Sequence, residues 1–248
     1  MGSRRGRRLF LTLLLAPLLT AFAGCVPAQR VPLRDPPSLD LLRLLPAPPA
    51  PGSLETRAEL DRILEVEAAR TPEREALARA DVELSLFRLL PGDDEGDLRP
   101  AGLPGIRALS DRLRDEVLRT VEPAKQSFAR PRPFVLDPRI RPCVPTPSTP
   151  SYPSGHASFA MAGARVLIDL APEWGEEITS RAREFAWSRV VCGVHYPSDV
   201  VAGEVLGRAI AERLLASPRF RRGLEPARRE LRAALGLAPE PALQDRSA

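Results

Sequence analysis

The chain has 248 residues, 44% of them hydrophobic, which is enough for one good-sized domain around a single core. It carries 36 basic and 32 acidic residues, but four arginines and no acids lie within residues 1–24. The rest of the chain is therefore electrically balanced, which excludes the strongly basic footprint of a nucleic-acid-binding protein.

Residues 1–24 have the layout of an export signal. Four arginines precede an apolar run from Leu9 to Ala23, which is too short and too interrupted by proline for a good spanning helix. The stretch Phe22 to Cys25 resembles a bacterial lipoprotein processing site, with Cys25 as the lipidated residue, while Ala21 to Ala23 also fits an ordinary cleavage site. We expect a periplasmic, cell-surface or secreted protein, either lipid-anchored or free.

Residues 25–37 are rich in proline and are expected to form an extended tether. Apolar residues then recur at helical spacing, beginning at Ser53, and again from Thr71 to about Leu90. Further helices are expected at about 106–128, 156–171, 174–191, 197–215 and 218–236, with loops at 92–105 and 130–155 and a disordered tail at 238–248. No run indicates a strand. The sequence thus predicts an all-α fold with several helices around one core.

The cysteines offer one pairing. If Cys25 belongs to the processing site, Cys143 and Cys192 remain as an even pair in an oxidising compartment, where a disulfide is expected. Two separate buried thiols are the alternative.

Three polar clusters contain the rarest residue types of the chain. The first runs from Lys125, the only lysine, to Arg132 and Pro133; the second is Pro153-Ser154-Gly155-His156; the third runs from Ser188-Arg189 through His195 to Asp199. His156 and His195 are the only histidines. Arg130 is left out of the candidate site, because it neighbours Arg132 in a chain that is rich in arginine throughout.

These clusters supply what phosphoryl transfer requires. Lys125, Arg132 and Arg189 are cations that can stabilise charge on the equatorial oxygens of the transition state. The helix start after Ser154 and Gly155 offers backbone donors for an anion. A nucleophilic imidazole needs an acceptor on its far nitrogen, and a second imidazole can protonate the leaving group.

The clusters resemble the K-x6-R-P, P-S-G-H and S-R-x5-H-x3-D motifs of the type 2 phosphatidic acid phosphatase superfamily. The chain is most similar to its bacterial class A nonspecific acid phosphatases, over about 38–237, which would be the catalytic domain. The resemblance implies a single-domain helical bundle of the kind shared with vanadium haloperoxidases. It also implies hydrolysis of small phosphate monoesters through a phosphohistidine, without metal or other cofactor.

The resemblance also assigns roles by position. His195 is the nucleophile, His156 the acid and base, and Asp199 orients His195. The phosphate-binding residues are Lys125, Arg132, Ser154, Gly155 and Arg189. Pro150 and Ala157 stand where the class A signature usually has glycine and threonine, and Ala157 is expected to remove a hydroxyl from the pocket edge.

Other functions are weighed against this one. A vanadate-dependent haloperoxidase would use the same cage, and an oxyanion-binding lipoprotein would need no nucleophile. The membrane lipid phosphatases of the superfamily are excluded, because no apolar run of spanning length follows residue 24. We expect no nucleic-acid partner and contact with a membrane only through a lipid on Cys25. A homo-oligomer is left open.

Overall fold

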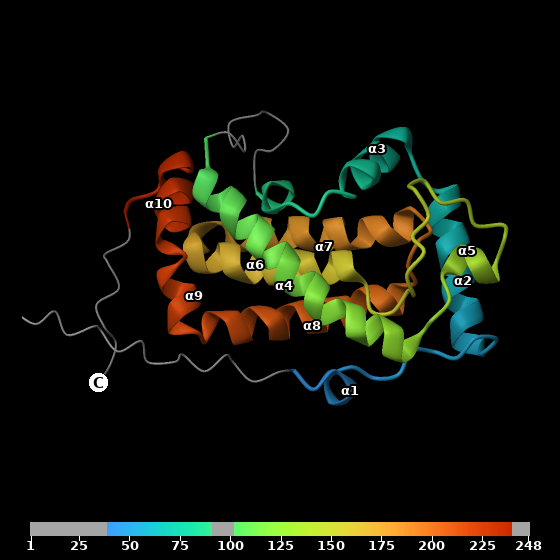
Figure 1. Ribbon diagram of the computed structural model, residues 1–248. Coiled ribbons are helices and arrows are strands. Elements are labelled where there is room, and N and C mark those ends of the chain that lie inside the picture. Colours follow the sequence, from blue (N-terminus) through green and yellow to red (C-terminus); the bar gives the residue numbers. More distant parts are fainter. Residues whose placement is uncertain (1–38, 91–101, 240–248) are drawn as a thin grey trace, which may run out of the picture. The chain divides into compact units, whose positions relative to one another are not determined.

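The computed structural model describes residues 39–90 and 102–239 (Figure 1). Within these ranges all regular elements are helices and no strand occurs, which confirms the predicted all-α fold. The α-helices are α1 (Leu41–Leu44), α2 (Leu54–Ala68), α3 (Pro72–Ala80), α4 (Pro104–Phe128), α5 (Pro133–Leu136), α6 (Gly155–Leu170), α7 (Gly175–Val191), α8 (Pro197–Leu215), α9 (Pro218–Arg222) and α10 (Glu225–Ala234). Two 3₁₀ helices are η1 (Leu86–Leu89) and η2 (Pro172–Trp174). The signal, Cys25, the tether and the distal tail lie outside the described residues.

Helix α6 forms the centre of the core. Twelve of its 16 residues are buried, as expected for a helix that is small or apolar on all sides. It lies between α7 and α8 and packs mainly against these two, and α4 crosses another of its faces (Figure 1).

Two glycines of α8 allow this helix to approach α6 closely. A Cβ atom at Gly203 would lie 2.5 Å from the carbonyl oxygen of Ser154, and one at Gly207 would collide with the carbonyl of Ser158. Any larger residue would force the helices apart. The close contact holds the start of α8, which carries Asp199, beside the start of α6, which carries His156.

Helix α4 brings Lys125 into the interior. Its apolar residues recur three or four positions apart and face the core, including Leu113, Val117 and Val121. Lys125 lies on the same face in the last turns and is buried. The helix ends at Ala129, whose φ of 47° is in the left-handed region, and the chain then turns into the proline-rich loop.

The helix predicted from Thr71 to Leu90 is wrong beyond Ala80. There α3 ends at Asp81, whose carboxylate is fully buried and pairs with Arg181 of α7 and with Arg88. Its other oxygen accepts a hydrogen bond from Ser188 at 2.7 Å. These contacts with distant residues end the helix, and the chain resumes only as the short η1.

The helix predicted at 218–236 is divided into α9 and α10. A continuous helix would place the ring of Pro226 against the carbonyl of Arg222, and Pro226 has no N–H to donate. The chain instead turns at Gly223 and Leu224. The helices expected at about 106–128, 156–171, 174–191 and 197–215 correspond to α4, α6, α7 and α8.

Candidate active site

The three polar clusters meet around one cavity of about 450 Å³. They come from the end of α4 and the following loop, the start of α6, and the end of α7 with the turn into α8. Of the residues predicted for the site, those that line the cavity are Lys125, Arg132, Gly155, His156, Arg189 and His195. The other two phosphate-site and catalytic candidates, Ser154 and Asp199, are fully buried beside it.

His195 is held by Asp199. The Nδ1 atom of His195 lies 3.1 Å from Oδ2 of Asp199. Because a carboxylate only accepts, Nδ1 carries the proton and Nε2 keeps a lone pair. Arg132 Nη1 donates to this Nε2 at 2.8 Å. Burial, and then the charges of Arg132 and Lys125, lower the pKa of His195 well below its usual value, which favours the neutral, nucleophilic imidazole.

Asp199 is itself fixed by three further donors. The Ser151 hydroxyl donates to Oδ2 at 2.5 Å and the Tyr196 backbone N–H donates to the same oxygen at 3.0 Å. Arg130 donates to Oδ1 at 2.6 Å. Burial without partners would strongly disfavour this carboxylate, so these donors make its position possible.

Arg130 belongs to a buried ion network that the sequence analysis missed. Its guanidinium bonds to Glu59 of α2 at 2.7 Å as well as to Asp199, and lies over the ring of Tyr196 with 3.7 Å to the centroid. Glu59 also accepts from the backbone N–H of Ser198 at 2.7 Å. One signal could have indicated Arg130. In an extended segment, residues two positions apart point to the same side. Arg130 and Arg132 do so here, since Arg130 reaches Asp199 and Arg132 reaches His195.

Lys125 and Arg132 are anchored by carbonyl groups of the loop before α6. Lys125 Nζ donates to the carbonyls of Pro150 at 2.6 Å and Ser151 at 3.2 Å, and Arg132 Nε donates to that of Thr149 at 2.9 Å. Burial and the charge of Arg132 lower the pKa of Lys125 to about 7, and burial lowers that of Arg132 to about 10. Because the charge of Arg132 disfavours the charged form of Lys125, a bound anion would stabilise the charged amine.

Arg189 is the third cation. Its Nη2 donates to the carbonyl of Ala78 at 2.5 Å, at the end of α3. Its buried Nε has no hydrogen-bond partner among the described residues. A buried donor without a partner is costly, and Arg189 lines the cavity, so an oxyanion there could satisfy it.

His156 faces the same cavity from α6. Its Nε2 lies 3.1 Å from the carbonyl of Val82, which accepts only, so Nε2 carries a proton and Nδ1 is the nitrogen free to exchange one. The ring stacks near Phe185. Burial, and then the charge of Arg189, lower the pKa of His156 to about 3. A bound dianion would offset the charge contribution and raise that pKa.

Of the residues at the start of α6, Ser154 and Ala157 lie outside the cavity. The hydroxyl of Ser154 accepts from the backbone N–H of Ala157 at 3.3 Å and caps α6, while Gly155 lines the cavity. Ala157 is fully buried and does not line the cavity, so the expected loss of a hydroxyl at the pocket edge is wrong. Its side chain instead lies beside Gly203, where α6 and α8 meet.

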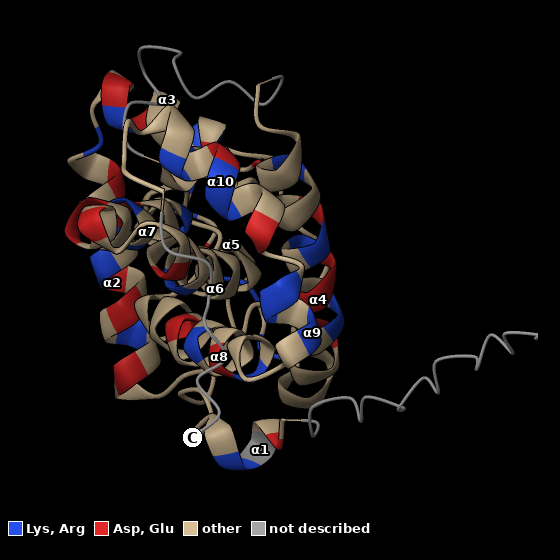
Figure 2. Ribbon diagram, turned by 90° about the vertical axis from the view of Figure 1, so that its left-hand side faces the viewer, with Lys and Arg blue, Asp and Glu red and all other residues tan. Residues whose placement is uncertain are grey.

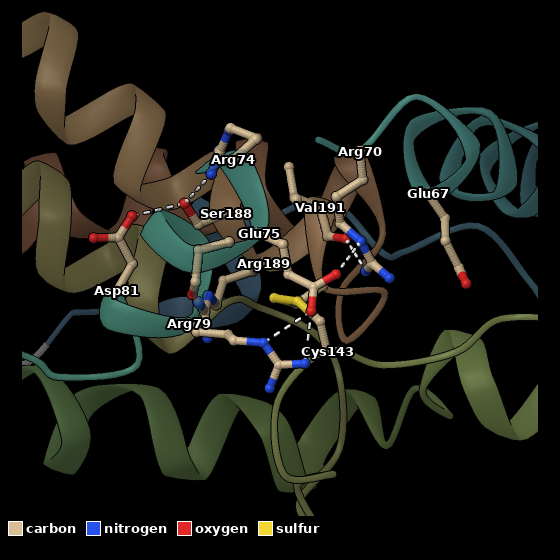
Figure 3. Close-up of a disulfide and its surroundings, with 12 residues drawn as sticks. Glu67, Arg70, Arg74, Glu75, Arg79, Asp81, Cys143, Ser188, Arg189 and Val191 are labelled. Atoms are coloured by element: carbon tan, nitrogen blue, oxygen red, sulfur yellow. Dashed lines mark hydrogen bonds and ion pairs between the residues drawn. A yellow bond between two sulfur atoms is a disulfide. The ribbon is translucent and has the colours of Figure 1, made fainter. Parts of the chain in front are cut away.

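Ser188 and the disulfide lie outside the cavity and hold the segments that carry its residues. Figure 3 shows Ser188 turned toward Asp81, with Arg74 donating to its hydroxyl at 3.1 Å. The expected disulfide between Cys143 and Cys192 is present, with 4.7 Å between the Cα atoms. It joins the proline-rich loop to the end of α7, three residues from His195.

Comparisons with known proteins agree with the motifs. The family described as the PAP2 superfamily matches residues 116–222. A non-specific acid phosphatase of Providencia stuartii is 29% identical over 211 residues, covering 80% of this chain and 83% of that protein. An acid phosphatase of Zymomonas mobilis subsp. mobilis is 32% identical over 211 residues, covering 82% of this chain and 79% of that protein.

A similar fold occurs among solved structures. A bacterial vanadium-dependent iodoperoxidase is similar with a TM-score of 0.54 and 20% identity, over 72% of this chain and 54% of that chain. At this identity the likeness concerns the fold alone. In residues 39–90 and 102–239, no helix combines the length and apolar character needed to cross a membrane.

Proposed function

The chain belongs to the PAP2 superfamily, and from this membership and the geometry of the cavity we propose that it is an exported acid phosphatase. It hydrolyses organic phosphate monoesters through a phosphohistidine on His195. The relatives named as acid phosphatases match about four fifths of the chain, which supports the reaction type. The observation that carries the mechanism is the contact between His195 Nδ1 and Asp199, which leaves Nε2 as the nitrogen able to attack, in a cavity that Lys125, Arg132 and Arg189 also line.

In the first step, Arg132 releases Nε2 of His195 and donates to the phosphoryl oxygens instead, and the lone pair on Nε2 attacks phosphorus as the ester P–O bond breaks. The leaving oxygen takes a proton from Nδ1 of protonated His156. A nitrogen–phosphorus bond forms, and the positive charge on His195 is balanced by Asp199. Negative charge on the equatorial oxygens is stabilised by the three cations and by backbone donors near Gly155.

In the second step, His156 accepts a proton from water as the water oxygen attacks phosphorus. The nitrogen–phosphorus bond breaks, which returns the electron pair to Nε2 of His195 and releases inorganic phosphate. The proton on His156 then prepares it for the next substrate, so one imidazole serves as acid and base in turn.

We propose that the reaction needs no metal ion. In many phosphoryl-transfer enzymes Mg²⁺ neutralises the charge that develops on the phosphoryl oxygens. The proposal is supported by three cationic side chains that line the cavity, Lys125, Arg132 and Arg189. The export signal expected at residues 1–24 supports a location in the periplasm, on the cell surface or outside the cell.

The test is hydrolysis of p-nitrophenyl phosphate at acidic pH in the presence of EDTA. The wild-type protein is expected to remain active, and His195→Asn is expected to be inactive. Val201→Ser, on the exposed face of α8, serves as the control that keeps activity. Activity that appears only after a divalent metal is added would contradict the metal-free mechanism, and full activity of His195→Asn would contradict the role of His195.

A further inference from the structure

The cavity is larger than a phosphate group requires. Its volume of about 450 Å³ falls within the range of pockets that enclose whole organic ligands, roughly 300–1,000 Å³. Of the residues that would hold the phosphoryl group, Lys125, Arg132, Arg189 and His195 are buried. The cavity therefore also has room for the alcohol portion of the substrate.

Apart from Glu122 and Thr149, apolar side chains form the rest of the wall. They come from three separate segments, the turn after α3, the C-terminal half of α4 and the loop after α5, and include Val82, Leu84, Leu118, Val121, Val144 and Pro145. We call these six residues the apolar mouth. Polar alcohols would lose hydration there without gaining hydrogen bonds from these side chains, whereas apolar ones would gain free energy by leaving water.

Two members of the apolar mouth are unusually exposed. Leu118 is 45% exposed and Val82 is 42% exposed. The outer face of α4 otherwise carries acidic and basic side chains (Figure 2), and Leu118 is the only large hydrophobic side chain exposed on that helix. Because Leu118 and Val82 also line the cavity, they extend its apolar wall to the molecular surface.

The acidic residue that lines the cavity also bears on the choice of leaving group. Glu122 is the one acidic residue among the described residues that line the cavity, and it lies one helical turn after Leu118. Its carboxylate is exposed and accepts a hydrogen bond from Gln126 at 2.6 Å. A negative charge there disfavours leaving groups that are themselves anionic.

We propose that the apolar mouth binds the leaving group, and that the preferred substrates are phosphate monoesters of uncharged, apolar alcohols or phenols rather than sugar phosphates or nucleotides. This inference rests on the proposed phosphatase function and specifies the substrate class of the same site.

A series of n-alkyl phosphates tests it. Ethyl, butyl and hexyl phosphate release alcohols of nearly equal basicity, so the chemical step stays comparable while the apolar area grows. Each buried methylene is expected to raise kcat/KM about fourfold, from about 0.8 kcal/mol per CH₂, until the mouth is filled. Glycerol 3-phosphate, close in size to butyl phosphate but polar, should show no such gain.

Variants locate the effect. Leu118→Ser is expected to lower the ratio of kcat/KM for hexyl over ethyl phosphate at least severalfold. Val201→Ser, an equally simple change at a side chain that is 62% exposed on α8 and outside the cavity, should leave the ratio unchanged. A wild-type ratio near one, or equal ratios in the two variants, would overturn the inference. Failure to hydrolyse any ester, p-nitrophenyl phosphate included, would instead contradict the proposed function.

Discussion

Arg130 Nη1 and Asp199 Oδ1 lie 2.6 Å apart, and both side chains are almost completely buried. The other oxygen of the same carboxylate holds Nδ1 of His195. Glu59 closes the network on the far side of Arg130. The orientation of the candidate nucleophile thus depends on an ion pair reaching from α2, far from it in the sequence.

Replacement of Arg130 should therefore damage catalysis through His195. Arg130→Met leaves Asp199 buried with one partner fewer, and a displacement of about 1 Å at the nucleophile can cost about 10²-fold in rate. We expect kcat to fall about 10²-fold with a smaller change in KM, because the phosphate-binding cations remain. Arg130→Lys, which keeps the charge, should recover part of kcat.

The matched control is Arg208→Met, which breaks an exposed ion pair with Glu204. It should leave kcat unchanged, because surface pairs contribute about 0–1 kcal/mol. Thermal unfolding must be followed in parallel, since breaking a buried pair costs about 3–5 kcal/mol. A folded Arg130→Met protein with wild-type kcat would show that the network does not position His195.

His156 should matter in proportion to the basicity of the leaving group. An alkyl alkoxide needs a proton as it departs, whereas p-nitrophenolate does not, and general acid catalysis contributes about 10²- to 10⁴-fold. His156→Ala is thus expected to lose far more activity on butyl phosphate than in phosphoryl transfer from p-nitrophenyl phosphate. Single-turnover kinetics with both esters measure the difference. Equal losses for both esters would rule out the acid role.

Anion binding should take up protons at Lys125. With its pKa lowered to about 7, Lys125 is mostly neutral at pH 8 in the free protein. A bound dianion favours the charged amine and raises this pKa, so about one proton should be taken up at pH 8. The number of protons taken up can be measured by calorimetry of sulfate binding in two buffers of different ionisation enthalpy. Sulfate is suitable because it does not titrate in this pH range.

The control for that experiment is Lys125→Arg. Arginine stays charged at pH 8, so the proton uptake should disappear even if sulfate still binds. Uptake that persists in this variant would assign it to another group, and its absence from the wild-type protein would contradict the lowered pKa of Lys125.

The disulfide should contribute both to the stability of the fold and to the activity of the site. A bridge spanning 49 residues contributes about 4 kcal/mol in the chain-entropy view. It also ties the loop whose carbonyls hold Lys125 and Arg132 to the end of α7. Cys143→Ser with Cys192→Ser should lower the unfolding midpoint and kcat together. Mass spectrometry of the alkylated, unreduced protein should find neither cysteine free; alkylation of both would refute the bridge in the exported protein.

The sequence reveals the clusters because their residue types are rare. Lys125, His156 and His195 stand out in a chain with one lysine and two histidines, and each of them falls in one of the three clusters. The long helices are evident because α4 and α8 bury periodic apolar faces, and because α6 is a long run of small and apolar residues.

What the sequence does not reveal depends on pairs of residues far apart in the chain. Glu59 and Arg130 are 71 positions apart, and neither is distinguishable from the many other acidic and arginine residues before folding. Asp81 likewise ends α3 through its contact with Arg181, 100 positions away. Local periodicity contains no information on such contacts, because tertiary packing decides them.

The most direct test of the phosphohistidine mechanism is trapping with a ³²P-labelled aryl phosphate under an alkaline denaturing quench, followed by mapping of the label. Label that is acid-labile and base-stable should appear on His195. It should accumulate in His156→Ala, where water is no longer activated, and be absent from His195→Asn. Label on a serine, or rapid turnover by His195→Asn, would contradict the account.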